Sequence, residues 1–93
     1  MPIEAIVLNR EDNVATAVRR LESGEMAGFD SDASVTITRD IPFGHKFALH
    51  DIESGGNIIK FGEIIGQATV KIKQGEHVHV HNVEGIRGRG DRQ

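Results

Sequence analysis

The chain has 93 residues, of which 14 are acidic and 11 are lysine or arginine, so its formal charge is −3. This length allows one small domain with a thin hydrophobic core, and the negative charge argues against nucleic acid as the main ligand. The absence of cysteine excludes disulfides and thiolate metal sites. No apolar run approaches the about 20 residues of a membrane span, so we expect a soluble, cytoplasmic protein that binds no membrane.

The first half of the chain predicts two strands and one helix. Residues 3–8 (IEAIVL) are apolar and β-branched, which is typical of a strand. Apolar side chains recur at helical spacing within residues 12–24, and Gly24 lies where a helix commonly stops, so we expect a helix of about two to three turns there. Residues 34–41 (SVTITRDI) alternate between apolar and polar side chains and predict a second strand. The helical spacing is that of Val14, Ala17, Val18 and Leu21.

The second half predicts short strands separated by turns. Pro42 and Gly44 mark a turn. Strand-like runs follow at residues 57–62, 63–72 and 76–83. Several short strands with a single helix are typical of a compact, mostly β domain.

A short pattern recurs ahead of the predicted strands. An aliphatic residue, two polar residues and a glycine occupy residues 21–24, 52–55 and 72–75. We expect each glycine to supply a turn with positive φ. The domain is expected to cover residues 1–84, and the basic, glycine-interrupted residues 85–93 are expected to form a disordered tail.

Three of the five histidines occupy every second position of the segment GEHVHVHNVEG. Alternate side chains of a strand share a face, so His77, His79 and His81 are expected on one face and the valines between them in the core. Histidines two apart lie roughly 6.6 Å apart along a strand, so a neighbouring pair with a third ligand from elsewhere suits one metal ion. All three could share an ion only if the strand bends sharply. The alternative is a solvent-facing strand that uses histidine as a polar residue.

A second candidate follows the Pro-x-Gly turn in PFGHKFALHD. Such turns present side chains on exposed, rigid backbone. His45 can exchange protons near neutral pH, and Lys46 can bind a carboxylate as a point charge. Adjacent strand residues face opposite ways, so the two share one site only if the turn twists them. The alternative is a surface turn with two ordinary polar side chains.

Four phrases in the same order, DNVATAV, IPFGHKFALHDI, IIKFGEIIGQA and GEHVHVHN, resemble the N-terminal SAF-type domain of the altronate dehydratase family. That family also includes galactarate dehydratase and the small subunit of sulfolactate sulfo-lyase. The likeness runs from about Ile6 to Asn82. It implies a β-clip fold, a long hairpin folded back on itself, with one or two short helices.

The resemblance also implies an activity, the β-elimination of water from altronate to give a 2-keto-3-deoxy sugar acid, with Fe²⁺ or Mn²⁺ as divalent metal. The reaction removes a proton next to a carboxylate, stabilises an enediolate and protonates the departing hydroxyl. We expect residues with suitable chemistry to fill these roles: His45 as acid–base group or ligand, Lys46 as carboxylate or enediolate binder, His77, His79 and His81 as metal or substrate contacts, and Asn82 as a residue that orients a substrate hydroxyl.

Two departures from the family pattern bear on these roles. Phe61 stands where the family usually has tyrosine, so a phenolic hydroxyl is missing. Galactarate-acting members keep the His-Lys pair without the triple histidine. This difference favours His45 and Lys46 over the triple histidine as obligatory groups.

In the family this domain precedes a much larger catalytic domain, fused or separate. We expect no deep cleft for a six-carbon acid in this chain. It is therefore interpreted as a small subunit whose histidine face closes over an active site carried mainly by a large dehydratase subunit, and self-association is also compatible with the sequence. Two alternatives stay open: the small subunit of sulfolactate sulfo-lyase, which expels sulfite, and a non-enzymatic SAF module that binds carbohydrate or scaffolds a partner.

Overall fold

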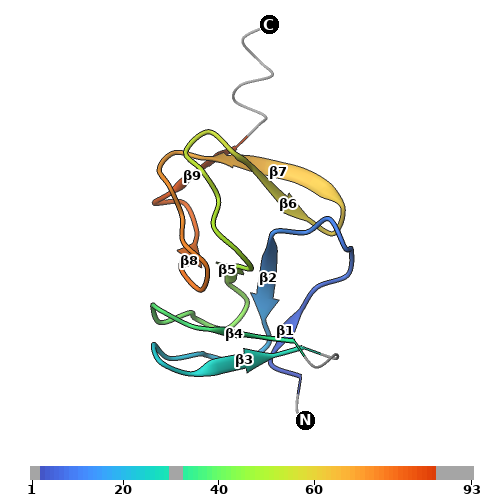
Figure 1. Ribbon diagram of the computed structural model, residues 1–93, viewed down its shortest axis with the longest axis vertical. Coiled ribbons are helices and arrows are strands. Elements are labelled where there is room, and N and C mark those ends of the chain that lie inside the picture. Colours follow the sequence, from blue (N-terminus) through green and yellow to red (C-terminus); the bar gives the residue numbers. More distant parts are fainter. Residues whose placement is uncertain (1–2, 30–32, 86–93) are drawn as a thin grey trace, which may run out of the picture.

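A computed structural model describes residues 3–29 and 33–85, which form nine short strands in three antiparallel sheets (Figure 1). The four-stranded sheet has the order β1 (Ala5–Ile6), β2 (Val14–Ala17), β5 (Lys46–Ala48) and β8 (His77–Val78). The two-stranded sheet consists of β3 (Met26–Gly28) and β4 (Ser34–Thr36). The three-stranded sheet has the order β6 (Asn57–Lys60), β7 (Glu63–Ala68) and β9 (Val83–Gly85).

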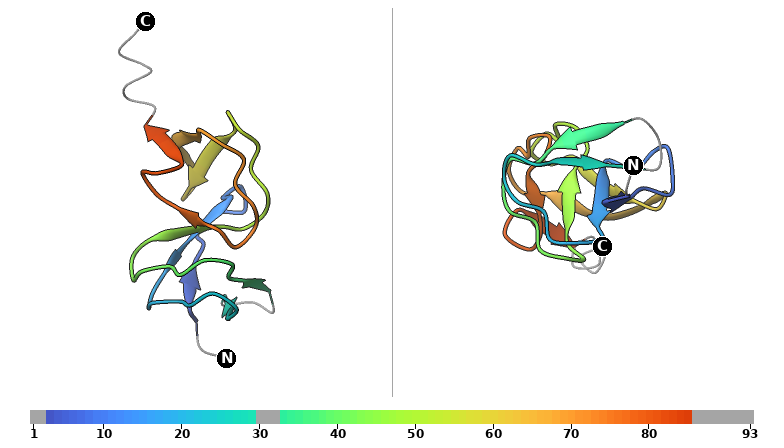
Figure 2. Two further views of the ribbon diagram at one scale, coloured as in Figure 1. Left: turned by 90° about the vertical axis from the view of Figure 1, so that its left-hand side faces the viewer. Right: turned by 90° about the horizontal axis from the view of Figure 1, so that it is seen from below.

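The four-stranded sheet is buried on both faces. Figure 1 shows β3 and β4 on one side of it and β6, β7 and β9 on the other, and the side view in Figure 2 shows the same order. Because side chains alternate along β5, Phe47 joins the hydrophobic cluster that contains Ala27 and Val35, while Ala48 joins the cluster that contains Ile58. The chain therefore builds two small cores, one on each face of the same sheet.

The helix expected at residues 12–24 is wrong, since this segment contains β2 and none of the described residues is helical. The physical reason lies in the two cores. Val14 contributes to one and Ala15 and Ala17 to the other, so β2 is apolar on both faces. A strand that is buried on both faces loses its alternation, and periodicity then cannot distinguish it from a buried helix.

The recurring glycine pattern forms four equivalent turns. The positive φ expected at Gly24, Gly55 and Gly75 is confirmed, and Gly44 supplies a fourth case. In each turn the residue after the glycine donates its N–H to the carbonyl three residues earlier, as Glu76 does to Lys73 at 3.0 Å. The aliphatic residues that open the patterns pair in two bridges, Leu21 with Ile41 and Ile52 with Ile72. Each core thus contains one bridge and the two turns that follow its paired residues.

The mostly β fold class is confirmed, although several strands are shorter than expected. The continuous strand at residues 76–83 is wrong, because β8 ends at Val78 and the chain turns before β9. Val80 was expected in the core, yet it is 82% exposed at this turn. The strand β3 was not expected. Met26 is exposed and Gly28 closes the strand, so β3 has too few apolar side chains to give a pattern.

The remaining expectations are a disordered tail at residues 85–93 and the absence of a membrane span. Gly85 is the last residue of β9, and the rest of the expected tail, residues 86–93, lies outside the described residues. Within the described residues, no helix has the length and apolar character to cross a membrane.

Candidate functional site

A cluster of three histidines forms where β5 meets β8. The two strands pair Lys46 with Val78 and Phe47 with His77. His45 directly precedes β5, so the same antiparallel register brings it opposite His79. The ligating nitrogens of His45, His77 and His79 all lie within 4.8 Å of one another. The sequence pointed to a neighbouring pair and a third ligand from elsewhere, and the structure has this arrangement.

The three imidazole rings are stacked. The ring centroids of His45 and His79 are 4.2 Å apart with 18° between the planes, and those of His45 and His77 are 5.0 Å apart with 20°. The Nδ1 of His45 and the Nε2 of His77 are 2.8 Å apart, which is a hydrogen-bonding distance. One of these two nitrogens therefore carries a hydrogen and the other presents a lone pair.

Asn82 holds the turn that shapes this cluster. Its side chain is buried, with the residue only 5% exposed. Its Oδ1 accepts the N–H of His79 at 3.0 Å and its Nδ2 donates to the carbonyl of His77 at 2.9 Å. Both polar atoms are thus used within the turn. The role expected for Asn82, orienting a substrate hydroxyl, stays a prediction.

The same turn separates His81 from the other histidines. His81 is exposed, and its ring lies 5.3 Å from that of His77 at an angle of 35°. It is not a member of the three-nitrogen cluster. The sequence predicted His77, His79 and His81 as metal contacts. In the structure His45 joins His77 and His79, and His81 lies at the edge of this cluster.

Burial and mutual repulsion favour the neutral imidazole at His77 and His79. Partial burial, followed by positive charge on the neighbouring histidines and Lys46, lowers the pKa of His77 from its ordinary 6.5 to about 4. Burial and the charges of the same neighbourhood also lower the pKa of His79. Neutral imidazole has a lone pair to give to a metal ion, whereas imidazolium has none.

The donor set fits a divalent transition metal. Nitrogens bound tetrahedrally to one ion at about 2.0–2.1 Å lie roughly 3.3 Å apart, and the observed separations run from 2.8 Å for one pair up to 4.8 Å. These separations are compatible with one shared ion. The cluster contains no carboxylate. Imidazole suits iron and zinc better than manganese, which prefers oxygen ligands.

Lys46 lies on the opposite face of β5 from His45, as strand alternation requires. It is half-buried, and burial followed by the charge of Lys60 lowers its pKa. Its own charge still contributes to the lowered pKa values of His77 and His79. Lys46 is thus electrostatically coupled to the cluster without being a member of it. Its expected binding of a carboxylate stays a prediction.

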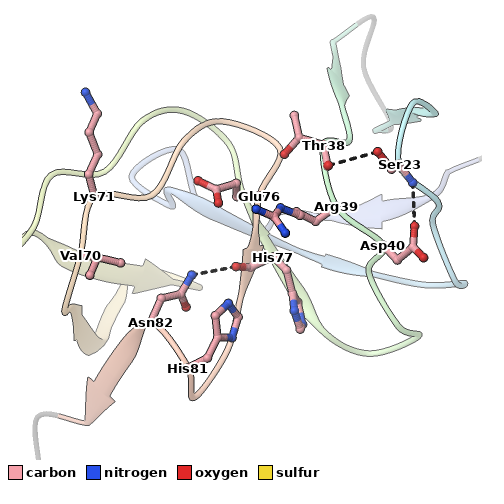
Figure 3. Close-up of a pocket in the computed structure, with 10 residues that line it drawn as sticks. All are labelled: Ser23, Thr38, Arg39, Asp40, Val70, Lys71, Glu76, His77, His81 and Asn82. Carbon is pink, nitrogen blue, oxygen red and sulfur yellow. Dashed lines mark hydrogen bonds between the residues drawn. The ribbon is translucent and has the colours of Figure 1, made fainter.

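The cluster borders an open hollow of about 640 Å³ (Figure 3). His77 belongs to both, and His81 and Asn82 also line the hollow. The opposite wall comes from the segment that follows β4, including Thr38, Arg39 and Asp40. A volume of this size lies within the range of ligand sites. Because the hollow is open, the expectation that this chain has no deep cleft stays a prediction.

Sequence reasoning missed Arg39, which extends over this hollow in Figure 3. Arg39 lies in a segment whose alternation indicated only a strand, and no local motif marks it. It also missed that Asp12 and Asn13 contact the hairpin of β6 and β7. Gly62 donates its N–H to Asp12 Oδ1 at 2.8 Å, across 50 positions of the chain.

The protein is a small antiparallel β domain with a histidine cluster beside a polar hollow. Residues 3–85 match the altronate/galactarate dehydratase SAF domain. The chain therefore belongs to this family.

Curated relatives include both single long enzymes and a short subunit. Altronate dehydratase of Escherichia coli (strain K12) is 44% identical over 80 residues, which are 86% of this chain and 16% of that protein. Altronate dehydratase of Bacillus subtilis (strain 168) is 39% identical over 79 residues, 85% of this chain and 16% of that protein. The (2R)-sulfolactate sulfo-lyase subunit alpha of Chromohalobacter salexigens is 38% identical over 90 residues, 90% of this chain and 96% of that subunit. The chain thus spans a small fraction of the two dehydratases and nearly all of the subunit.

Proposed function

We propose that this chain is the small subunit of an altronate-type dehydratase and contributes to the β-elimination of water from a sugar acid, giving a 2-keto-3-deoxy acid. The observation that carries the proposal is the convergence of three imidazoles beside a polar hollow. The highest identity among the relatives described is to an altronate dehydratase, at 44%. The name of the sulfo-lyase subunit alpha supports a second chain as partner, and the 16% of the altronate dehydratase that this chain covers supports a larger one.

The roles of the residues follow from their positions. His45, His77 and His79 would hold the divalent metal, and their all-nitrogen donor set favours Fe²⁺ over Mn²⁺. When bound, the ion would supply Lewis-acid stabilisation of negative charge on the substrate. The partner is expected to provide further ligands, because three histidines leave the coordination of iron incomplete.

Proton transfer is assigned to His81. It is exposed, lines the hollow, and lies outside the three-nitrogen cluster. Its imidazole can therefore accept or donate a proton without giving up a metal-binding lone pair. Lys46 is assigned to the substrate carboxylate, since it is half-buried and has no ion pair within the described residues.

The second candidate function is that of the sulfolactate sulfo-lyase small subunit. The specific observation in its favour is the extent of the match, which covers 96% of the subunit alpha from Chromohalobacter salexigens. Both reactions begin with removal of a proton next to a carboxylate and differ in the group that leaves, sulfite or water. The same histidines and hollow serve either reaction.

The experiment reconstitutes this chain with the large-subunit candidate encoded nearest to it. The two purified chains are mixed with Fe²⁺ or Mn²⁺ and assayed with altronate and with sulfolactate. His79→Ala is expected to lower kcat/KM by about 100-fold or more. His50→Ala is the matched control, because His50 is exposed and lies outside the cluster.

The outcomes separate the candidates. Activity on altronate that needs both chains and His79 supports the dehydratase, and activity on sulfolactate alone supports the sulfo-lyase. A large chain that is fully active by itself contradicts both, and so does a silent His79→Ala substitution in a folded domain. The non-enzymatic module would then be the better description.

A further inference from the structure

The charged side chains that line the hollow differ in whether they already have partners. Asp40 accepts hydrogen bonds from Arg20 and from the N–H of Ser23, both at 3.0 Å. Lys71 forms an ion pair with Glu53 at 3.5 Å, and Glu76 accepts the N–H of Lys73 at 2.6 Å. Within the part of the chain that the structure describes, Arg39 alone among these side chains forms no hydrogen bond or ion pair.

The backbone on both sides of Arg39 is fixed. The N–H of Thr38 donates to the carbonyl of Gly75 at 3.0 Å, which ties this segment to the strand that carries His77. On the other side, Asp40 is held by its bond to Ser23, and Ile41 pairs with Leu21 in a bridge. The backbone of Arg39 is therefore already ordered beside the hollow, so a ligand has to order only its exposed side chain.

We propose that Arg39 binds an anionic group of the acid substrate, a carboxylate or a sulfonate, inside this hollow. The planar guanidinium offers a fork of donors that matches such oxyanions in a bidentate way. His77 lines the same hollow and belongs to the histidine cluster. An anion held by Arg39 therefore brings the carbon skeleton of the substrate against the cluster.

This assignment rests on the proposed function for the identity of the ligand, but the binding itself is a property of this chain. It makes Arg39 a second anion-binding residue, in addition to Lys46 on the opposite face of β5. Acids of this class carry a carboxylate and, in sulfolactate, a sulfonate as well. Altronate has one anionic group and sulfolactate two, so either acid offers Arg39 an oxyanion to bind.

The test is a titration of the 93-residue chain, followed through its backbone amide resonances by NMR. The probes are altronate, sulfolactate, and altritol as a neutral polyol. We expect saturable shifts at Arg39 and His77 with an acid and none with altritol. Arg39→Ala should weaken the binding at least about tenfold and Arg39→Lys should weaken it less, because lysine keeps the charge without the fork. Arg10→Ala is the control, since Arg10 is exposed and does not line this hollow.

Each outcome has one meaning. If Arg39→Ala affects both acids, the bound group is a carboxylate, and if it affects only sulfolactate, the bound group is the sulfonate. The proposal is overturned if neither acid gives a saturable shift, or if Arg39→Ala binds as wild type does while its thermal unfolding is unchanged.

Activity of the reconstituted complex separates this proposal from the proposed function. If the complex is active and its KM is the same with Arg39→Ala as with wild type, the proposed role of Arg39 is contradicted and the proposed lyase function stands. If the complex is inactive on both acids but this chain binds them through Arg39, the proposed lyase function is contradicted and the binding site stands.

Discussion

Two tight turns of the molecule are supported in different ways. The turn at residues 79–82 is held by Asn82, whose side chain bonds to residues three and five positions away. The turn at residues 60–63 joins β6 to β7, and it is held from outside by residues about 50 positions earlier in the chain. There Asn13 Oδ1 accepts the N–H of Ile59 at 2.7 Å and Asn13 Nδ2 donates to the carbonyl of Asn57 at 2.7 Å.

The second turn also carries more strain. Phe61 has a φ of 54° and Gly62 a φ of 81°, the combination of a type I′ hairpin turn. Phenylalanine is a costly residue at the first of these positions, where asparagine, aspartate or glycine is usual. Asp12, which accepts the N–H of Gly62, has a second carboxylate oxygen that is buried without a hydrogen-bond partner. A locally held turn therefore satisfies its polar groups, whereas the externally held turn keeps a strained residue and an unsatisfied oxygen.

The largest effect is expected from breaking the external support. Asn13→Ala leaves the part-buried N–H of Ile59 and the carbonyl of Asn57 without their side-chain partner, so the free energy of unfolding should fall by about 3 kcal/mol. Urea denaturation followed by circular dichroism measures this change. Asn57→Ala is the matched control, because the side chain of Asn57 is exposed, and it should change stability by less than about 0.5 kcal/mol.

The internal support should matter less. Asn82→Ala removes two part-buried hydrogen bonds of 3.0 and 2.9 Å within one turn, both longer than the 2.7 Å bonds of Asn13, and we expect a loss of about 1–2 kcal/mol. An equal or larger loss than that of Asn13→Ala would contradict the distinction between the two turns.

Acid should destabilise the histidine cluster with a defined sign. The pKa of His77 is about 4 in the folded chain and 6.5 ordinarily. Between these two values His77 is protonated in the unfolded chain and neutral in the folded chain. The free energy of unfolding therefore falls as the pH drops from about 6.5 toward 4. After solvent screening we expect about 1–2 kcal/mol from this group.

Denaturation at several pH values between 7.5 and 5 measures this effect before most carboxylates titrate. His77→Gln should flatten the pH dependence, and His50→Gln should leave it unchanged because His50 is exposed. A dependence that survives in His77→Gln would show that His77 is not its source.

The smallest effect should come from relieving the strained turn. Phe61→Asn places a residue that tolerates positive φ, so we expect a gain of about 0.5–1 kcal/mol in the free energy of unfolding. The loss of the contact between the ring and Lys60 Nζ, 4.9 Å from its centroid, offsets part of the gain. Thermal unfolding of Phe61→Asn against Phe43→Asn measures the difference, since Phe43 is exposed and lacks a positive φ. If Phe61→Asn is less stable than the wild type, the contacts of the phenyl ring contribute more to stability than the positive φ of Phe61 costs.

Local chemistry explains which features could be predicted from the sequence. Glycine at the third position of a turn has one preferred conformation, so Gly24, Gly55 and Gly75 gave their turns directly. The two-residue spacing of His77 and His79 indicated a neighbouring pair of ligands, because it depends only on the geometry of an extended chain. The family was likewise recognisable from four phrases in order, and residues 3–85 confirm it.

Tertiary structure decided the rest. The segment that begins at Val14 has apolar spacing that fits a helix, and only the presence of a core on each side makes it a strand. His45 joins His77 and His79 through the register of β5 with β8, which no local pattern specifies. Arg39 reaches the hollow because a backbone bond ties Thr38 to Gly75. The sequence by itself thus determined the family, the turns and the kinds of side chain available. Which side chains meet at one site depended on pairings between distant strands, because the free energy of those pairings comes from burial and hydrogen bonds that exist only once the sheets are packed.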